Sequence, residues 1–438
     1  MIKEKDQAYI WHPFTPLVAD EAALVIKKAQ GLYLYTEDDR AIIDAISSWW
    51  VNLHGHSHPA IAEAIYQQAK NLEHVIFAGF THEPAVTLAE KLLKILPSNQ
   101  TKVFFSDDGS TACEVAIKMA LQYWHNKGRN NKKKIIALEG SYHGDTFGAM
   151  SVGERNGFSA PFADKLFEVE FLPFPDCHEV NCCVGIQKHC SGVKFAIEKM
   201  EEMAKSGEVA AFIYEPLVQG VAGMRMYSAK ILDKLLQIAQ ENNIICIADE
   251  VMTGFGRTGK LFASHYCEFQ PDIICLSKGL TGGTMALGLT TCNEKIVQAF
   301  LSAESNKTFY HGHSFTANPL ACAAALASLD LLLQRSCIDA ISQIEQLHLK
   351  FEKQISTYKN IKEVRVLGTI LAIELRNNEQ TGYFNSIAKK AYRFFIERNI
   401  LLRPLGNVIY IFPPYIIKEA ELQKVYEVIL EFLETEPT

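Results

Sequence analysis

A lysine and a carboxylate each follow a buried, strand-like run in the middle of the chain. Residues 243–248 (NIICIA) form one apolar run that Asp249 follows, and residues 271–277 (PDIICLS) form the next, which Lys278 follows. In open α/β sheets ligands bind at the carboxyl ends of the strands, so the two side chains could face one ligand. A lysine whose pKa is lowered by burial forms Schiff bases with carbonyl compounds. The alternative is that two unrelated polar residues end two strands.

A possible anion site precedes a predicted helix. The strand-like residues 102–106 (KVFFS) are followed by Asp108-Gly109-Ser110 and then by a helical pattern over 112–124. Glycine permits close backbone approach, and the free amides of a helix N-terminus attract anions, although a plain helix cap uses the same residue types. A reactive lysine, a carboxylate and a phosphate site are together what pyridoxal phosphate requires.

The segment GFGRTGK at 254–260 matches two nucleotide-binding patterns superficially. The dinucleotide pattern should open a crossover helix, which is not evident here, and the P-loop pattern needs Ser or Thr after the lysine, where this chain has Leu261. We therefore interpret the segment as a glycine-rich active-site loop. A nucleotide-binding or scaffold protein is the alternative from a different functional class.

Histidines and cysteines cluster at two places. His54, His56 and His58 have no standard metal-ligand spacing, so they are expected to be structural or to line a site. The stretch 177–190 contains four of the eleven cysteines but no C-x-x-C unit, which favours a loop with reduced thiols over a zinc site. We predict no metal.

Aromatic and arginine side chains complete the candidate site. Tyr142 follows the strand-like run 134–138 and could stack on a planar cofactor at the same sheet edge. Arg403 lies between an apolar pair and a proline, and its guanidinium could bind a carboxylate in a bidentate manner. A surface ion pair is the alternative for Arg403.

The elements that must position these residues form an α/β pattern. Short apolar runs at 102–106, 134–138, 210–214, 244–248 and 273–276 alternate with helical segments, which predicts a mostly parallel sheet covered on both faces. We expect one large domain over 51–325. Residues 326–438 read as helix, two strands split by Gly368, helix, strand and helix, and with strands near 32–35 and 41–44 from residues 1–50 they should form a smaller α+β domain.

Composition limits the class of protein. The chain has 438 residues, 48% of them apolar, and its 43 basic and 50 acidic residues give a net charge of −7. Mild acidity without basic runs does not favour nucleic-acid binding. No run reaches the ~18 apolar residues of a membrane helix, and the N-terminus does not resemble a secretory signal. We expect a cytoplasmic enzyme with reduced thiols and no membrane partner.

Three long segments resemble the class III, fold-type I aminotransferases, which use pyridoxal phosphate. They are ADEVMTGFGRTGKLFA, CLSKGLTGGT and HSFTANPLACAAALASL, and the resemblance extends from about residue 10 to 416. It implies a large domain with a mostly parallel seven-stranded sheet, a smaller domain from both termini, and a homodimer with shared active sites. It also explains the glycine-rich loop without a nucleotide.

The resemblance implies roles for individual residues. Lys278 would bind the cofactor covalently and transfer a proton, Asp249 would pair with the pyridine nitrogen and Tyr142 would stack on the ring. The remaining residues that it implies are Asp108, Gly109, Ser110, His313 and Ser314 at the cofactor, Phe14, Trp49, Trp50, Gly312 and Arg403 at the substrate, and, less strongly, Glu215 and Gln219. Residues 312–314 would come from the other subunit.

Further segments point to substrates. WHPFTP, SSWWVNLHGHSHP and RPLGNVIYIFPPYII resemble the class members that move the amino group of S-adenosyl-L-methionine to 8-amino-7-oxononanoate in biotin biosynthesis. Those members commonly have tyrosine where this chain has Phe14. The sequence HGHS at 311–314 also occurs in relatives that use lysine, so lysine as donor and another ω-aminotransferase activity stay open.

Overall fold

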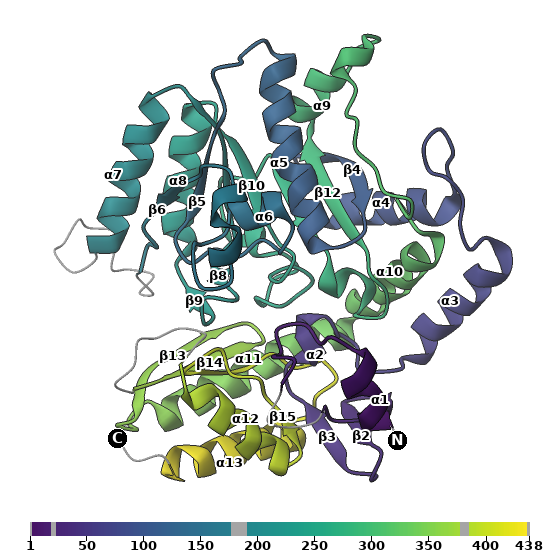
Figure 1. Ribbon diagram of the computed structural model, residues 1–438, viewed down its shortest axis with the longest axis vertical. Coiled ribbons are helices and arrows are strands. Elements are labelled where there is room, and N and C mark those ends of the chain that lie inside the picture. Colours follow the sequence, from purple (N-terminus) through teal and green to yellow (C-terminus); the bar gives the residue numbers. More distant parts are fainter. Residues whose placement is uncertain (1, 19–22, 177–190, 377–384, 436–438) are drawn as a thin grey trace.

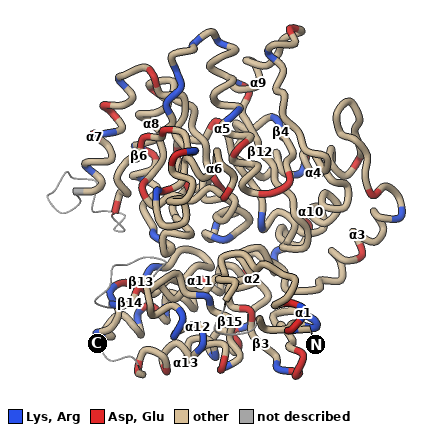
Figure 2. Tube along the Cα trace, in the orientation of Figure 1, with Lys and Arg blue, Asp and Glu red and all other residues tan. Residues whose placement is uncertain are grey.

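The computed structural model describes residues 2–18, 23–176, 191–376 and 385–435. Two parts of the molecule lie one above the other, and both ends of the chain lie in the lower part (Figure 1). Acidic and basic residues are interspersed along both parts (Figure 2). Among the described residues, no single helix is long and apolar enough to cross a membrane, and α10 (Pro319–Leu332) and α11 (Arg335–Ile355) pass that test only together, across a 69° bend.

The upper part is built on a seven-stranded sheet in the order β4-β12-β11-β10-β7-β5-β6. Strand β12 runs opposite to the other six strands, which are parallel to one another, so the predicted α/β class with a mostly parallel sheet is confirmed. The strands are β4 (Gln100–Ser106), β5 (Lys134–Leu138), β6 (Glu170–Leu172), β7 (Val209–Tyr214), β10 (Ile245–Asp249), β11 (Ile273–Leu276) and β12 (Gly288–Asn293).

Helices cover both faces of this sheet. Along β10, Ile245 and Ile247 pack with α5 (Gly109–Asn126), whereas Cys246 and Ala248 belong to the core that includes α8 (Ala229–Glu241). Because both faces are buried, the central strands β5, β7, β10 and β11 are almost entirely apolar, which is the pattern that predicted them. The other helices of this part are α6 (Phe147–Ser151), α7 (Ser191–Lys205), α9 (Glu294–Phe300) and the short 3₁₀ turns η1 (Ala160–Lys165), η3 (Ala263–Tyr266), η4 (Lys278–Thr281) and η5 (Ser305–Lys307).

The lower part contains two small sheets, one of which joins the two ends of the chain. Strands β1, β2 and β3 form an antiparallel meander, and β15 adds to β3 in parallel. The second sheet is the antiparallel set β13-β14-β16. The strands are β1 (Ile26–Gln30), β2 (Tyr33–Thr36), β3 (Ala41–Asp44), β13 (Ile361–Leu367), β14 (Ile370–Leu375), β15 (Ile400–Leu401) and β16 (Val408–Ile411).

The remaining helices link and cover these sheets. Helix α11 packs on β13 and β14, α12 packs on β15, and α13 packs on both of these helices, while α3 and α4 pack against α10. The expected domain boundary at 325 falls inside α10, and the division into 51–325 and 1–50 with 326–438 stays a prediction. The bounds not yet given are α1 (Ile2–Tyr9), α2 (Ser47–Trp50), α3 (Pro59–Asn71), α4 (Glu83–Ile95), α12 (Ile387–Glu397), α13 (Glu419–Thr435), β8 (Val218–Gln219) and β9 (Arg225–Met226).

Candidate active site

A cavity of about 720 Å³ opens at the carboxyl ends of the central strands. Strands β10 and β11 and the helix α5 each deliver side chains to it, as the sequence predicted from the ends of the apolar runs. The predicted residues that line it are Trp50, Asp108, Gly109, Ser110, Tyr142, Glu215, Asp249 and Lys278. Gln219 is buried outside it, where its side-chain amide donates to the Glu139 carbonyl over 2.9 Å.

Lys278 is the nucleophile candidate of this cavity. It begins the turn η4 directly after β11, and its φ of 45° lies in the left-handed region. Burial is the main cause that lowers the pKa of Lys278, although Asp249 and Glu215 oppose the shift. The ammonium nitrogen lies 4.8 Å from the ring centre of Trp50. A lowered pKa raises the fraction of neutral amine, which is the nucleophilic form.

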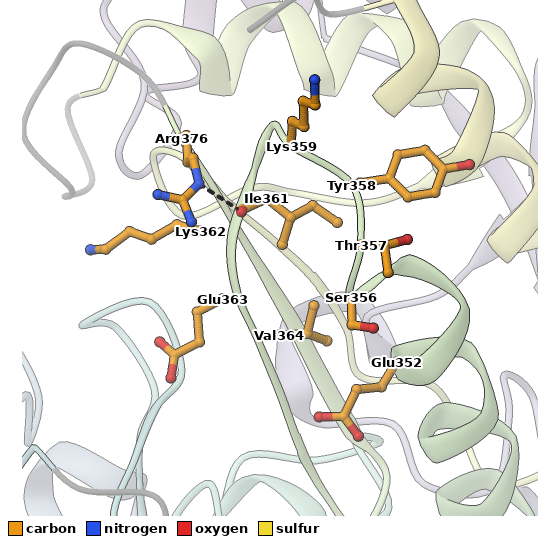
Figure 3. Close-up of a pocket in the computed structure, with 10 residues that line it drawn as sticks. All are labelled: Glu352, Ser356, Thr357, Tyr358, Lys359, Ile361, Lys362, Glu363, Val364 and Arg376. Carbon is orange, nitrogen blue, oxygen red and sulfur yellow. Dashed lines mark hydrogen bonds between the residues drawn. The ribbon is translucent and has the colours of Figure 1, made fainter.

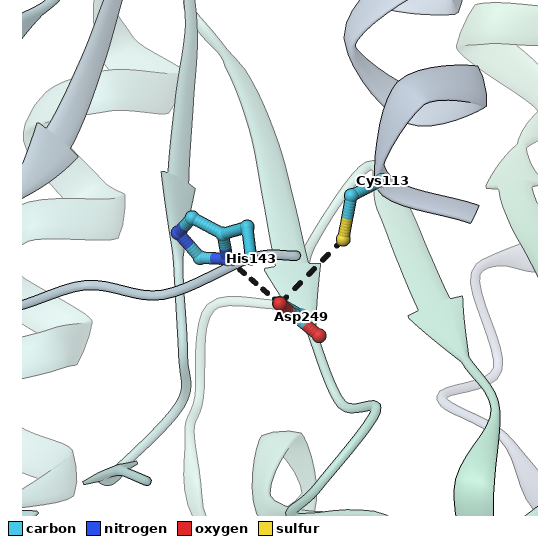
Figure 4. Close-up of side chains that lie close together, drawn as sticks. All are labelled: Cys113, His143 and Asp249. Carbon is cyan, nitrogen blue, oxygen red and sulfur yellow. Dashed lines mark hydrogen bonds and ion pairs between the residues drawn. The ribbon is translucent and has the colours of Figure 1, made fainter. Parts of the chain in front are cut away.

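Asp249 is buried within a hydrogen-bonded cluster (Figure 4). Its Oδ2 lies 2.7 Å from Nδ1 of His143 and 3.5 Å from the Cys113 thiol, which donates to it. Its Oδ1 accepts from the backbone of Val251 over 3.0 Å. The carboxylate is therefore fixed in orientation at the end of β10, where Asp249 lines the cavity.

The same three side chains have the composition of a metal site, since one ligand atom of each lies within 4.8 Å of the others. The 2.7 Å between His143 and Asp249 is a hydrogen-bond distance. Two ligands of a tetrahedral zinc at about 2.0–2.1 Å would lie about 3.3 Å apart. A hydrogen bond with Cys275, followed by burial and the nearby Asp249, also holds the pKa of the Cys113 thiol well above its usual value. The arrangement favours a hydrogen-bond network.

Glu215 and Tyr142 also line the cavity. The Glu215 carboxylate accepts from the backbone of Tyr142 over 3.1 Å and of Gly220 over 2.9 Å. Burial raises the pKa of Glu215 to about 7. Burial also raises the pKa of Tyr142 above its usual value, and Asp145 adds to that shift. Tyr142 is therefore neutral near pH 7, and Glu215 keeps a substantial protonated fraction there that an ordinary carboxyl would lose.

The N-terminus of α5 closes the third side. Asp108 caps the helix by accepting from the backbone of Thr111, and the first amides of the helix point toward the cavity end. The Ser110 hydroxyl lies 2.8 Å from the Thr146 hydroxyl and accepts from the Thr146 backbone over 3.0 Å. A Cβ on Gly144 would lie 2.2 Å from the Ser110 hydroxyl, so only glycine allows the loop to approach the helix. The result is an anion cradle made of amides and hydroxyls.

The two tryptophans face different surroundings. Trp50 is buried, donates to the Tyr410 hydroxyl over 3.0 Å and lines the cavity. Trp49 is 40% exposed and does not line it. Instead, the Arg403 guanidinium lies 4.6 Å from the ring centre of Trp49, and Phe14 packs edge-on against the same ring at 5.6 Å. Phe14, Trp49 and Arg403 therefore form one group next to the cavity.

The segment 312–314 lies outside the cavity of its own chain. Gly312 and Ser314 are exposed, and Nδ1 of His313 is 3.5 Å from the carboxylate of Asp107, the residue before the helix cap. The contact of these three residues with a second subunit stays a prediction.

The glycine-rich segment 254–260, predicted as an active-site loop, contributes no residue to the lining of the cavity. Arg257 is buried, and its guanidinium donates to the carbonyls of Pro413 over 2.8 Å and Asn52 over 3.0 Å and stacks on Phe412 at 4.2 Å. The segment thus packs against the residues next to Trp50, on the side away from the cavity. The cysteine-rich stretch 177–190 lies outside the described residues.

A second hollow of about 370 Å³ lies between the end of α11 and β13 (Figure 3). Arg376 donates to the Ile361 carbonyl over 2.9 Å at its edge, and Lys362 is paired with Glu374. None of the predicted site residues lines it. Of the two hollows among the described residues, the one at the strand ends of the large sheet is therefore the candidate site.

Comparison with known proteins decides the family, because residues 17–433 match the aminotransferase class-III family. The chain belongs to that family. Among class III relatives, the adenosylmethionine-8-amino-7-oxononanoate aminotransferase of Synechococcus elongatus is 50% identical over 97% of this chain and 98% of its own length. The enzyme of the same name from Helicobacter pylori is 37% identical over 98% of this chain and 97% of its own length.

Solved class III structures confirm the fold. The adenosylmethionine-8-amino-7-oxononanoate aminotransferase of Methanocaldococcus jannaschii is 36% identical, with a TM-score of 0.92 over 100% of this chain and 99% of that one. An omega transaminase of Pseudomonas jessenii, solved in complex with PMP, is 26% identical at the same TM-score over 99% and 98% of the two chains. The predicted membership in the class III, fold-type I aminotransferases is thus confirmed.

Sequence reasoning missed several residues of this class III site. His143 and Cys113 contact Asp249 from positions more than 100 residues away, and no local pattern signals such a contact. Asp145, Thr146 and Met252 also line the cavity. The loop that contains Tyr142 was predicted to reach the sheet edge. That prediction could have identified Asp145 and Thr146, which lie in the same loop, as residues that line the cavity.

Proposed function

We propose that the chain transfers the amino group of S-adenosyl-L-methionine to 8-amino-7-oxononanoate with pyridoxal 5'-phosphate as cofactor, giving 7,8-diaminononanoate for biotin biosynthesis. The observation that carries the proposal is the convergence of Lys278, Asp249 and the N-terminus of α5 on one cavity. The 50% identity over nearly the whole chain to a relative named for this reaction supports the choice of substrates.

The residues present fit this cofactor. Lys278 has the lowered pKa that a Schiff-base lysine needs, and the fixed carboxylate of Asp249 suits a protonated pyridine nitrogen. The cradle of Gly144, Ser110 and the α5 amides suits a phosphate, because a Cβ at Gly144 would fill it. Bound pyridoxal phosphate would supply the electron sink and carry the amino group between the two substrates.

The chain's own groups would hold the substrates and move the proton. The Lys278 amine would hold the cofactor and then, once released, transfer a proton within the enclosed site. The raised pKa of Glu215 leaves that carboxyl partly protonated near neutral pH, which lowers the negative charge beside the cofactor. Tyr142 would stack on the ring.

One pocket must accept a cationic sulfonium compound and a long apolar keto acid. The rings of Trp50, Trp49 and Phe14 suit both, because aromatic faces attract cations and bury alkyl chains. Arg403, stacked on Trp49, would bind the carboxylate of the keto acid.

A homodimer with shared active sites is part of the proposal. Gly312 and Ser314 are exposed and do not line their own chain's cavity, which leaves Ser314 accessible to the phosphate site of a second copy. The seven described cysteines form no disulfide, which suits a reducing compartment, and the predicted cytoplasmic location stays part of the proposal.

The test is the donor half of the reaction. The purified protein should carry a visible chromophore whose spectrum changes when S-adenosylmethionine is added and is restored by 8-amino-7-oxononanoate. A colourless protein that takes up no pyridoxal phosphate would refute the aminotransferase proposal. A spectral change with lysine but not with adenosylmethionine would replace the donor by lysine, the alternative that the sequence HGHS leaves open.

A further inference from the structure

The turn that carries the two tryptophans has an unfavourable backbone. Ser47, Ser48 and Trp50 have φ values of 53°, 58° and 66°, which side-chain-bearing residues rarely adopt. Ser48 has ψ of −79°, outside the helical range. Such conformations persist only where surrounding contacts hold them, and they gather at functional sites.

Asp44, the last residue of β3, holds this turn. Its carboxylate is fully buried and accepts four hydrogen bonds. Oδ1 accepts from the backbone of Ile46 over 3.2 Å and of Ser48 over 2.8 Å. Oδ2 accepts from the Ser48 hydroxyl over 2.9 Å and lies 2.9 Å from Nε2 of His56. A single side chain therefore binds Ile46, just before the strained residues, and Ser48, one of them.

His56 is oriented to serve Asp44. Its Nδ1 lies 3.3 Å from the Asn52 side-chain nitrogen, which can only donate, so Nδ1 accepts and Nε2 carries the proton given to Asp44. The backbone of His56 pairs with Gly31 in both directions, which holds the imidazole in place. The buried carboxylate and the mostly covered imidazole, whose side chain is 14% exposed, form one hydrogen-bonded pair at the end of β3.

The same unit sets the position of Arg403. Asp44 is paired with Leu401 in the parallel β3–β15 ladder, two residues before Arg403. The chain leaves Asp44 toward Trp49 and leaves Leu401 toward Arg403, and the two side chains meet at 4.6 Å. The turn is fixed from the other side by the Ser47 hydroxyl, which donates to the Phe412 carbonyl over 2.8 Å.

We propose that Asp44 and His56 are positioning residues that hold the Trp49–Arg403 pair in register and so determine how tightly the pocket binds the carboxylate end of an extended substrate. The inference rests on the proposed function for the identity of that substrate, and on this structure for the geometry. Neither residue touches the cavity.

The test compares His56→Leu, which removes the donor to Asp44, with His56→Gln, whose amide can still donate. Two nonreactive probes, nonanoate and nonylamine, have the same chain length but differ in the head group, and tryptophan fluorescence reports their binding without any turnover. We expect His56→Leu to weaken nonanoate binding about tenfold, and to raise the KM for 8-amino-7-oxononanoate by a similar factor, with little change for nonylamine. His56→Gln should restore most of the loss.

The control is His54→Leu, which removes a neighbouring buried imidazole that lies 3.1 Å from the Ser328 hydroxyl and not near Asp44. It should leave the contrast between the two probes unchanged. A folded His56→Leu protein that keeps the contrast, or that loses both probes equally, would overturn the proposal. Failure of the proposed function would show instead as a wild-type protein without transamination, while the two probes could still be compared by fluorescence.

Discussion

At the scale of single residues, Lys278 combines two properties that rarely occur together, a left-handed backbone and a lysine side chain with a lowered pKa. Replacing it by alanine removes both the attachment of the cofactor and the proton carrier. We expect Lys278→Ala to remain folded and to lose at least about 1,000-fold in kcat, since a positioned acid–base group alone contributes up to about 10⁴. Absorbance spectra and steady-state rates measure the two effects, and an unchanged spectrum with full activity would contradict the role.

Glu215 gives the stability of the cofactor-free protein a pH dependence. Its folded-state pKa of about 7 lies above the ordinary 4.5, so between these pH values the folded protein keeps a proton that the unfolded chain releases. The free energy of unfolding should therefore fall as pH rises through this window, by up to about 3 kcal/mol for this group.

In Glu215→Gln that contribution is absent. Urea unfolding at pH 5 and pH 8 measures the free energy of unfolding of both proteins. From pH 5 to pH 8 this free energy should fall more in the wild type than in the variant. Parallel pH profiles for the two proteins would contradict the raised pKa.

Arg403 is predicted to recognise one substrate more than the other. A charge-assisted hydrogen bond to a carboxylate is worth about 1.5–3 kcal/mol, so Arg403→Ala should raise the KM for the keto acid roughly 10- to 100-fold. The donor half-reaction should change less. Arg403→Lys keeps the charge but not the planar fork and should fall between the two. Equal losses in both half-reactions of Arg403→Ala would contradict the assignment.

At the scale of elements, the contact between α5 and the loop that carries Gly144 forms the anion cradle. We expect Gly144→Ala to weaken cofactor binding by about tenfold or more, because the new Cβ would clash with Ser110 at a φ of +126°. The control is Gly128→Ala, since Gly128 also has a positive φ (+70°) but no atom within 4 Å of the added Cβ. Equilibrium dialysis of pyridoxal phosphate separates the two, and equal affinities would show that the loop approach is unimportant.

The elements differ in how clearly the sequence encodes them. Strands β5, β7, β10 and β11 are buried on both faces, and the resulting apolar runs predicted them almost to the residue. Strand β12 was missed because it contains polar Thr290 and Thr291, which are buried only because they donate to the Ala112 carbonyl and the Gln100 side chain. Those partners lie far away in the sequence, so local pattern alone could not reveal the strand.

The residues of the site also differ in how far the sequence predicts their positions. Asp249 and Lys278 were predictable because they directly follow strands of a parallel sheet, whose carboxyl ends share one edge. Trp49 was expected to line the cavity with Trp50, but the reversed backbone of the turn sends the two rings to different surroundings. Backbone strain of this kind depends on contacts such as those of Asp44, which only the folded chain brings together.

At the scale of the whole molecule, Ser314 is predicted to contact the cofactor but does not line the cavity of its own chain. The resemblance to class III enzymes assigns Ser314 to the phosphate of the other subunit, and its exposure is compatible with that. If each site draws Lys278 from one chain and Ser314 from the other, two inactive variants should complement each other in a mixed dimer.

We expect Lys278→Ala and Ser314→Asp, each nearly inactive alone, to recover about a quarter of wild-type activity when they are unfolded and refolded together in equal amounts. Half of the dimers would then be mixed, and each mixed dimer would hold one intact site and one site with both defects. The control is refolding each variant with itself, which should recover nothing. If the two residues served the same chain's site, every site in the mixture would carry one defect, and activity would stay at the level of the separate variants.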